Sequence, residues 1–226
     1  MPRTPAADRR PHRLTLRSYD VGFCDCFMLS FHYPRFDRHL LIDFGSTRLP
    51  EGRTGMNAHM TRIARQIAED CDGKLHAVVA THRHKDHISG FTTTPEGDGP
   101  GDIIRALKPN VVIQPWTEDP QAERDALRPS KGLSQRQRRT AAHAGMLRDM
   151  NAFAGHAMRA AARLKGSHLR EVREQIEFLG DDNDLKNRDA VVNLMTMGRT
   201  KYVYFGAKSG LDTLLPGVST RELAAL

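Results

Sequence analysis

Short apolar and alternating segments near the start of the chain predict three successive β-strands. Apolar and polar residues alternate from Leu14 to Tyr19, and two apolar runs follow at residues 24–31 and 38–42. Runs of this length are typical of strands rather than helices. The third run ends at residues 43–45, whose sequence Asp-Phe-Gly predicts a turn.

Helical spacing replaces this pattern after the turn. Apolar residues recur every three or four positions, which predicts an amphipathic helix over 57–70 with Asn57 as its N-cap. The next expected elements are a buried strand over 75–80, a short helix over 102–107 and a strand over 111–113. Strands and helices that alternate in this way predict a layered α/β fold.

The second half of the chain is expected to contain a long helical insertion. Residues 134–137 have the spacing of a capping box, and an Ala-rich stretch with apolar residues at helical spacing follows. We therefore expect a helical hairpin over about 134–180 that packs over the rest of the fold. Two further strands are expected after it, over 191–195 and 201–205.

Composition is that of an ordinary soluble protein. Of the 226 residues, 39% are hydrophobic and 27% are charged, and no stretch approaches the roughly 20 apolar residues of a membrane helix. Residues 1–13 carry Pro and Arg without an apolar run, so we expect a disordered lead-in rather than a secretory signal. One domain is then expected over 14–226.

The cysteines and the net charge narrow the setting. Cys24, Cys26 and Cys71 are too few for a disulfide framework and indicate reduced thiols in a cytoplasmic location. Cys24 and Cys26 are expected on one face of a strand, where small buried hydrophobes are favoured over metal ligands. The net charge of +7 favours an anionic substrate such as a phosphoester, and nucleic acid is a weaker hypothesis that rests on charge alone.

The run from Thr81 to His87 carries the strongest chemical signal. It places three imidazoles and one carboxylate within six residues, directly after the apolar run over 75–80. Imidazole nitrogen and carboxylate oxygen are ligands of Zn²⁺ and Fe. His82 and His84 would point to the same side in extended backbone and could hold one ion. Asp86 and His87 follow where the chain turns toward a helix, and they could reach a second ion.

The sequence His82-Arg83-His84-Lys85-Asp86-His87 resembles the signature of the metallo-β-lactamase superfamily. Residues 20–29 resemble the "DVGQGDAILI" opening of one branch, which includes the soluble domain of the bacterial competence protein for DNA uptake. Residues 41–45 resemble its "LIDxG" strand and turn. Residues 187–192 and 201–206 are similar to the family's late "NxxSVV" and "FLFTGD" segments, with departures.

This resemblance implies an αββα sandwich and a metal-dependent hydrolase that uses a metal-activated water on an unknown substrate. It assigns His82, His84, Asp86 and His87 as ligands of one or two Zn²⁺ ions, with Fe or Mn as alternatives. Asp86 would also orient the attacking water. Asp43 would hold one of the ligands in place, although capping the turn before Gly45 is an equal alternative.

The chain departs from the family pattern in its second half. Ala207 stands where a bridging Asp is normal, and no histidine follows His168. His143, His156 and His168 are the candidates for a third histidine of the first site. Because two ions without a bridging carboxylate would repel each other, we expect one firmly held metal or a weak second one. The strands over 111–113, 191–195 and 201–205 are assigned to an incomplete second half, so we also expect low activity and marginal stability. The open sheet edge could then pair with a second chain.

Three function classes stay open. The intact motif favours a metallo-hydrolase. Ala207 and the missing histidine favour a non-catalytic or truncated member that binds metal or a partner without turnover. A DNA-binding accessory protein rests only on the net charge and on the resemblance to the competence protein. Metal content and hydrolysis of a generic phosphodiester would separate the three.

Overall fold

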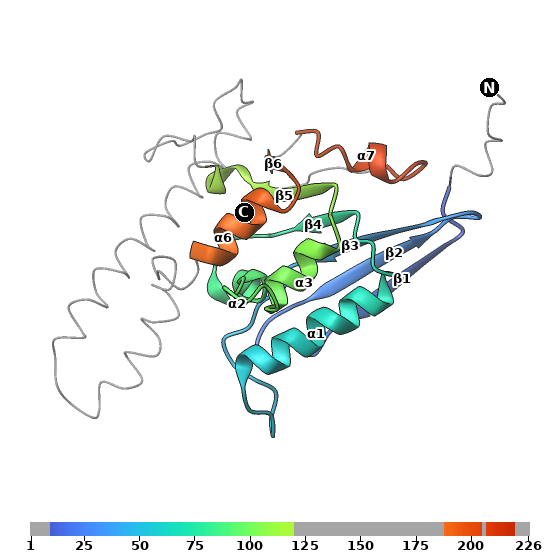
Figure 1. Cartoon of the computed structure of the whole chain (residues 1–226). Helices are drawn as coiled ribbons and strands as arrows, with labels where there is room; N and C mark the ends of the chain where they lie inside the picture. The colour runs from blue at the N-terminus through green and yellow to red at the C-terminus, as the bar shows by residue number, and fades with distance from the viewer. Residues whose placement is uncertain (1–9, 120–187, 205–206, 220–226) are drawn as a thin grey trace, which may run out of the picture.

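A six-stranded sheet forms the centre of the molecule in the computed structural model, which describes residues 10–119, 188–204 and 207–219. Strands β1 to β3 pair antiparallel, and β3 to β6 pair parallel (Figure 1). The class is α/β, as the alternating pattern predicts. The strands lie in the order β1 (Arg13–Ser18), β2 (Phe27–His32), β3 (Asp37–Ile42), β4 (Ala77–Val79), β5 (Val111–Pro115) and β6 (Arg199–Val203).

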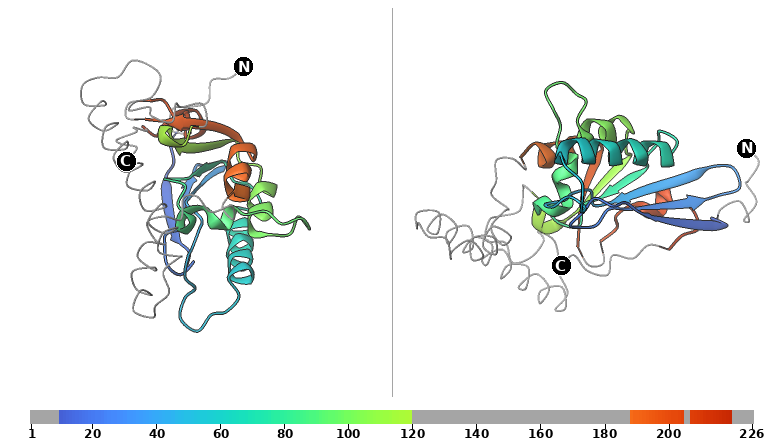
Figure 2. Two further views of the ribbon diagram at one scale, coloured as in Figure 1. Left: turned by 90° about the vertical axis from the view of Figure 1, so that its left-hand side faces the viewer. Right: turned by 90° about the horizontal axis from the view of Figure 1, so that it is seen from below.

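Helices cover both faces of this sheet. On one face lie α1 (Met56–Asp70), α3 (Pro100–Ala106) and α6 (Arg188–Thr196), whose apolar residues join the larger core (Figure 1). The short helix α7 (Leu211–Leu214) packs on the other face, against a smaller core (Figure 2). Alternate residues of strands β2 to β5 supply the two cores, since successive side chains of a strand point to opposite faces: Met28, Leu41, Val78 and Val112 in the larger, and Leu40, Ala77, Val111 and Ile113 in the smaller.

The last two strands extend the first sheet. Val111 of β5 pairs with Ala77 of β4, and β6 then pairs with β5. Their assignment to a separate second half was therefore wrong. In the described part of the chain, all six strands belong to this one sheet.

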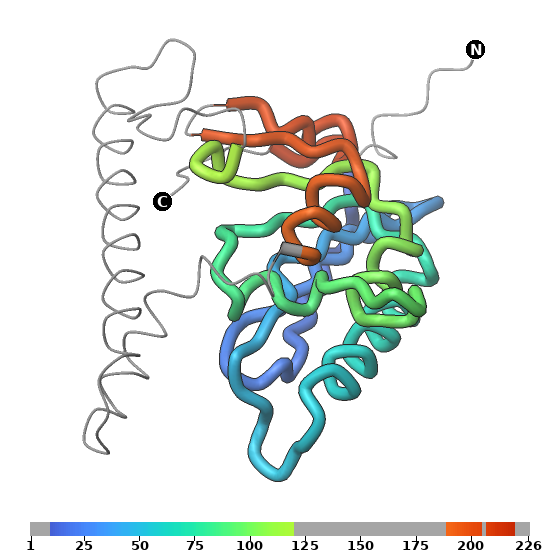
Figure 3. Tube along the Cα trace, turned by 60° about the vertical axis from the view of Figure 1, so that its left-hand side comes forward, coloured from blue at the N-terminus to red at the C-terminus, as the bar shows by residue number. Residues whose placement is uncertain are grey.

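Residues 191–195 form a helix and not the predicted strand. They lie in α6, where Ala190 and Leu194 are buried four residues apart, and Met197, directly after the helix, is buried three residues further on. The β-branched pair Val191-Val192 gave the segment a strand-like pattern, but the buried positions follow a helical period. Figure 3 shows α6, in orange, leading directly into β6.

Two local predictions also need correction. Asn57 lies inside α1, and the N-cap is Gly55, whose φ of 76° favours glycine. Strand β2 begins at Phe27, so Cys24 and Cys26 lie in the preceding turn and not on one face of a strand. Cys26 is buried, whereas Cys24 is only partly buried.

Several predictions lie outside the described residues. These are the lead-in up to residue 9 and the helical hairpin over 134–180. Among the helices of the described ranges, none is long and apolar enough to cross a membrane. Of the remaining elements, the 3₁₀ helix Trp116–Glu118 follows β5, and α2 (Lys85–Ile88) leads into the 3₁₀ helix Ser89–Phe91. Helix α2 contains the last three residues of the histidine motif.

Candidate metal centre

The histidine motif lies at the carboxyl ends of the parallel strands. Asp43 follows β3 directly, and Thr81 follows β4 after one intervening residue. Open α/β sheets place their ligand sites at this edge, because the loops that leave parallel strands gather there. The turn between β1 and β2 reaches the same edge, since Phe27 at the start of β2 pairs with Ile42 at the end of β3.

The motif brings its three imidazoles together. The backbone is extended at His84, with φ −66° and ψ 147°, before α2 begins at the next residue. The ring centroids of His82 and His84 are 4.5 Å apart, and those of His82 and His87 are 3.7 Å apart. The prediction that His82 and His84 point to one side is therefore confirmed as geometry.

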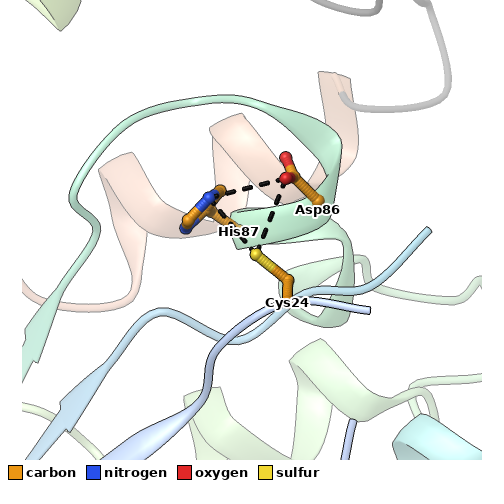
Figure 4. Close-up of side chains that lie close together, drawn as sticks. All are labelled: Cys24, Asp86 and His87. Atoms are coloured by element: carbon orange, nitrogen blue, oxygen red, sulfur yellow. Dashed lines mark hydrogen bonds and ion pairs between the residues drawn. The ribbon is translucent and has the colours of Figure 1, made fainter. Parts of the chain in front are cut away.

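Two groups of potential ligands form in the described residues, and they share Asp86. One comprises His82, His84 and Asp86, and the other comprises Cys24, Asp86 and His87, with the ligand atoms of each group within 4.8 Å of one another. The Cys24 Sγ lies 3.3 Å from His87 Nε2 and 3.6 Å from Asp86 Oδ2 (Figure 4). His87 Nε2 lies 3.5 Å from the same oxygen of Asp86.

The Asp43 side chain holds the histidine motif in place through Thr81 and His87. Its buried carboxylate accepts hydrogen bonds from the Thr81 backbone N–H at 2.7 Å and the Thr81 hydroxyl at 2.6 Å. The His87 Nδ1 lies 2.9 Å from Asp43 Oδ2, which assigns a proton to Nδ1 and directs Nε2 toward Asp86 and Cys24. A carboxylate that fixes an imidazole in this way is a common partner of a metal ligand.

The surroundings shift the pKa values of His82 and His87 in opposite directions. Burial and the neighbouring His87 and His84 lower the pKa of His82 to about 4, so its nitrogens carry no second proton at neutral pH. Burial acts to lower the pKa of His87 as well, but the hydrogen bond and charge of Asp43 outweigh it and raise that pKa. Burial and the nearby Asp86 raise the pKa of the Cys24 thiol to about 11.

Backbone contacts fasten the motif to the turn after β3. The Phe44 N–H donates to the His87 carbonyl at 2.8 Å, and the Gly90 N–H donates to the Phe44 carbonyl at 2.9 Å. A Cβ on Gly45 would overlap the backbone of Asp86 and His87, so only glycine lets the two turns approach this closely. The Gly of the resembling "LIDxG" pattern thus has a structural reason.

The turn that carries Cys24 is fastened to the same loop. The Phe23 N–H donates to the Arg48 carbonyl at 2.8 Å, and the Ser46 hydroxyl donates to the Phe23 carbonyl at 3.2 Å. Gly22 has φ 101° and lies directly against the Arg48 carbonyl, where no Cβ fits. The turn before β2, the turn after β3 and the motif after β4 are therefore packed against one another next to the potential ligands.

Sequence reasoning missed Cys24, Thr81 and Arg83 as contributors to this region. Thr81 supplies two of the hydrogen bonds to Asp43. The Arg83 guanidinium forms an ion pair with Glu118 at 3.2 Å and a hydrogen bond to Gln114, which ties the motif to the end of β5. A sequence signal for Cys24 was present, because it stands at the second Gly of the "DVGQGD" pattern, and in the structure its φ of 134° lies in the region that favours glycine.

The other expected ligands are less informative. His143, His156 and His168 lie outside the described residues. Ala207 follows β6 at the same sheet edge, and its backbone N–H donates to the Tyr204 carbonyl. Its methyl side chain offers no ligand atom, so the described residues hold no bridging carboxylate at that position.

Comparison with protein-family models, with curated proteins and with solved structures found no match to this chain. The proposed function therefore rests on the arrangement of the side chains.

The donor set suits a transition metal. It combines imidazole nitrogens, a shared carboxylate and a thiol, which are the ligand types that Zn²⁺ takes in proteins. The neutral state of His82 favours this chemistry, since protonated imidazole binds no metal. A bound cation is therefore a better partner for the three crowded imidazoles and the carboxylate than these side chains are for one another.

Proposed function

We propose that this protein is a metal-dependent hydrolase with a metallo-β-lactamase-like site. The observation that carries the proposal is the shared position of Asp86, which lies within ligand distance of the His82–His84 pair. The motifs that resemble the family support it: the turn after β3 and the turn before β2 both pack around the histidine run. The αββα sandwich of that family stays part of the proposal, and the single sheet of the described residues would be one of its two sheets.

In the proposed site, His82, His84 and Asp86 hold the first ion. When bound, a divalent ion lowers the pKa of a water that it holds from 15.7 toward about 7, which supplies a nucleophile at neutral pH. Asp86 orients that water through its carboxylate. Asp43 keeps the His87 ring in one tautomer, and Thr81 keeps Asp43 in place.

A phosphoester is the favoured substrate. The net charge of +7 attracts anionic substrates over long range. Zinc sites act on carbonyl centres as well, and the net charge favours the phosphoester only slightly.

A metal-binding protein without turnover is the alternative. Ala207 favours it, because a second ion would have no carboxylate from that strand to offset its charge.

Metal content and activity test both functions in one experiment. Purified protein should contain Zn²⁺, Fe or Mn²⁺ and should hydrolyse bis(4-nitrophenyl) phosphate. The double variant His84→Ala, Asp86→Ala should lose the metal and the activity together. The matched control is His32→Ala, Asp37→Ala, which removes a similar pair at the opposite end of the sheet and should keep both.

The outcomes separate the functions clearly. Metal with hydrolysis supports the hydrolase, and metal without hydrolysis of phosphate or carboxylate esters supports the alternative. A double variant that keeps the wild-type metal content would show that the motif is not the site.

A further inference from the structure

We propose that Cys24 is a thiolate ligand of a second divalent ion, held together with Asp86 and His87. This inference rests on the proposed function, because it uses Asp86 as the carboxylate that the two ions share. The geometry behind it is the group Cys24, Asp86 and His87, whose ligand atoms all lie within 4.8 Å of one another. Figure 4 shows the three side chains converging from two separate turns.

Each member of the group presents a ligand atom to the same place. His87 Nε2 is the ring nitrogen that does not contact Asp43, and it lies 3.3 Å from the Cys24 sulfur. Asp86 Oδ2 lies 3.6 Å from that sulfur and 3.5 Å from His87 Nε2. Three protein ligands with one position left open are typical of a catalytic zinc site.

Backbone strain at Cys24 accompanies this placement. Its φ of 134° lies in a region that favours glycine. A cysteine that keeps such a conformation while its sulfur points at a histidine and a carboxylate is consistent with a role for the sulfur.

Asp86 compensates for Ala207. A second ion close to the first needs a negative charge between them, and Ala207 supplies none. Asp86 belongs to both ligand groups, and the Cys24 thiolate adds a second negative charge. On coordination the thiol proton leaves to solvent, so the sulfur carries its charge to the ion.

The ligand types determine which ions fit. Thiolate is a soft ligand that favours Zn²⁺ and Co²⁺ over Mg²⁺ or Mn²⁺. The second site should therefore select Zn²⁺, or Co²⁺ as its substitute.

Cobalt substitution tests the proposal without relying on activity. Reduced, metal-free protein is titrated with Co²⁺, and the bound ions are counted while the near-ultraviolet sulfur-to-cobalt charge-transfer band is recorded. The key variant is Cys24→Gly, which removes the sulfur and suits the backbone conformation. Cys71→Ala, which removes a buried thiol at the end of α1, is the matched control. Cys24→Ser serves as a second variant that keeps a polar group.

Wild type and Cys71→Ala should bind two ions per chain and show the band. Cys24→Gly and Cys24→Ser should bind one ion, without the band. Two ions with no band, a band that persists in Cys24→Gly, or one ion with no band in wild type would each overturn the role of Cys24. The first ligand group and the proposed function would survive those results. Wild type that binds no Co²⁺ or Zn²⁺ at all would overturn the proposed function as well.

Discussion

Two histidine clusters lie at opposite ends of the same sheet, and they contain the same kind of pair. At the carboxyl end, His87 Nδ1 lies 2.9 Å from the Asp43 carboxylate. At the amino end, His32 Nδ1 lies 2.8 Å from the Asp37 carboxylate. What differs is the partner of the other ring nitrogen. His87 Nε2 meets the ligand atoms of Cys24 and Asp86, whereas His32 Nε2 meets the Thr15 hydroxyl at 2.9 Å.

The remaining histidines follow the same division. At the amino end, His39 Nδ1 bonds the Ser30 hydroxyl, and His76 Nδ1 accepts a hydrogen bond from the His39 backbone N–H. The Arg38 guanidinium lies 3.1 Å from His76 Nε2, where its charge would repel a metal ion. Within the described residues, the groups able to hold a metal are both at the carboxyl end.

The comparison shows that histidine density alone does not make a metal site. Both ends gather imidazoles and both include a carboxylate and a hydroxyl, but only the carboxyl end brings His82, His84, His87 and Cys24 close to one shared carboxylate, that of Asp86. The spacing of His82 and His84 on one extended segment produces the second arrangement, since adjacent strands contribute single histidines at the amino end.

A methyl group added at a glycine in the turn next to each cluster should affect the two ends of the sheet differently. Gly45→Ala should reduce the free energy of unfolding by about 3 kcal/mol and weaken metal binding, because its Cβ overlaps the backbone of the motif. Gly73→Ala, in the turn before β4, meets open space and should cost only about 1 kcal/mol for its left-handed φ of 68°. Urea unfolding measures both. Equal losses would contradict the close packing of the two turns around Gly45.

Neutralising the paired carboxylates should sharpen the division. Asp43→Asn should lower zinc affinity by about 10- to 100-fold, since an amide has one acceptor oxygen and cannot accept from both Thr81 and His87 as the carboxylate does. Asp37→Asn changes the equivalent pair at the amino end and should leave zinc affinity unchanged. A competition titration against a chromophoric chelator measures both constants. If the two variants bind zinc equally well, Asp43 does not position a ligand.

Acid should act on the amino-end cluster with or without metal. Burial, together with Arg38, lowers the pKa of His76 to about 4, below the 6.5 of an unfolded histidine. The unfolded chain therefore binds a proton that the folded chain excludes, and stability falls as the pH drops from about 6.5 to about 4. His76→Gln should remove up to about 1.4 kcal/mol per pH unit of that slope. Urea unfolding of wild type and His76→Gln at pH 7, 6 and 5 measures this difference in slope. The difference should be the same with chelator and with zinc. A difference that depends on zinc would show that the amino-end cluster is coupled to the metal site.

Local patterns made much of the fold predictable. The strands from β1 to β5 and helix α1 follow their apolar periods closely, and the motif after β4 needed no tertiary information. Helix α6 was missed because Val191 and Val192 favour strands locally, while packing of Ala190 and Leu194 against the core favours the helix. Tertiary packing decides such segments, and a local pattern does not contain it.

Cys24 could not be placed for a different reason. Its distance to His87 depends on the pairing of β2 with β3 and of β3 with β4, and the two residues are 63 positions apart in the chain. Asp43 was easier to predict, because the resembling turn pattern names it. Its partner Thr81 was not predicted, since a threonine in that position carries no pattern of its own.

The clustering of His82, His84, Asp86 and His87 within six residues also affects the unfolded chain. A denatured chain keeps these four groups near one another, so in the proposed site it would still bind zinc, although less tightly than the native protein. Because an ion that binds both states stabilises the native one only by the difference between the two affinities, zinc should protect the fold by less than its native affinity implies. The contribution reserved for the native state comes from Asp43 and Cys24, which only folding brings to the motif.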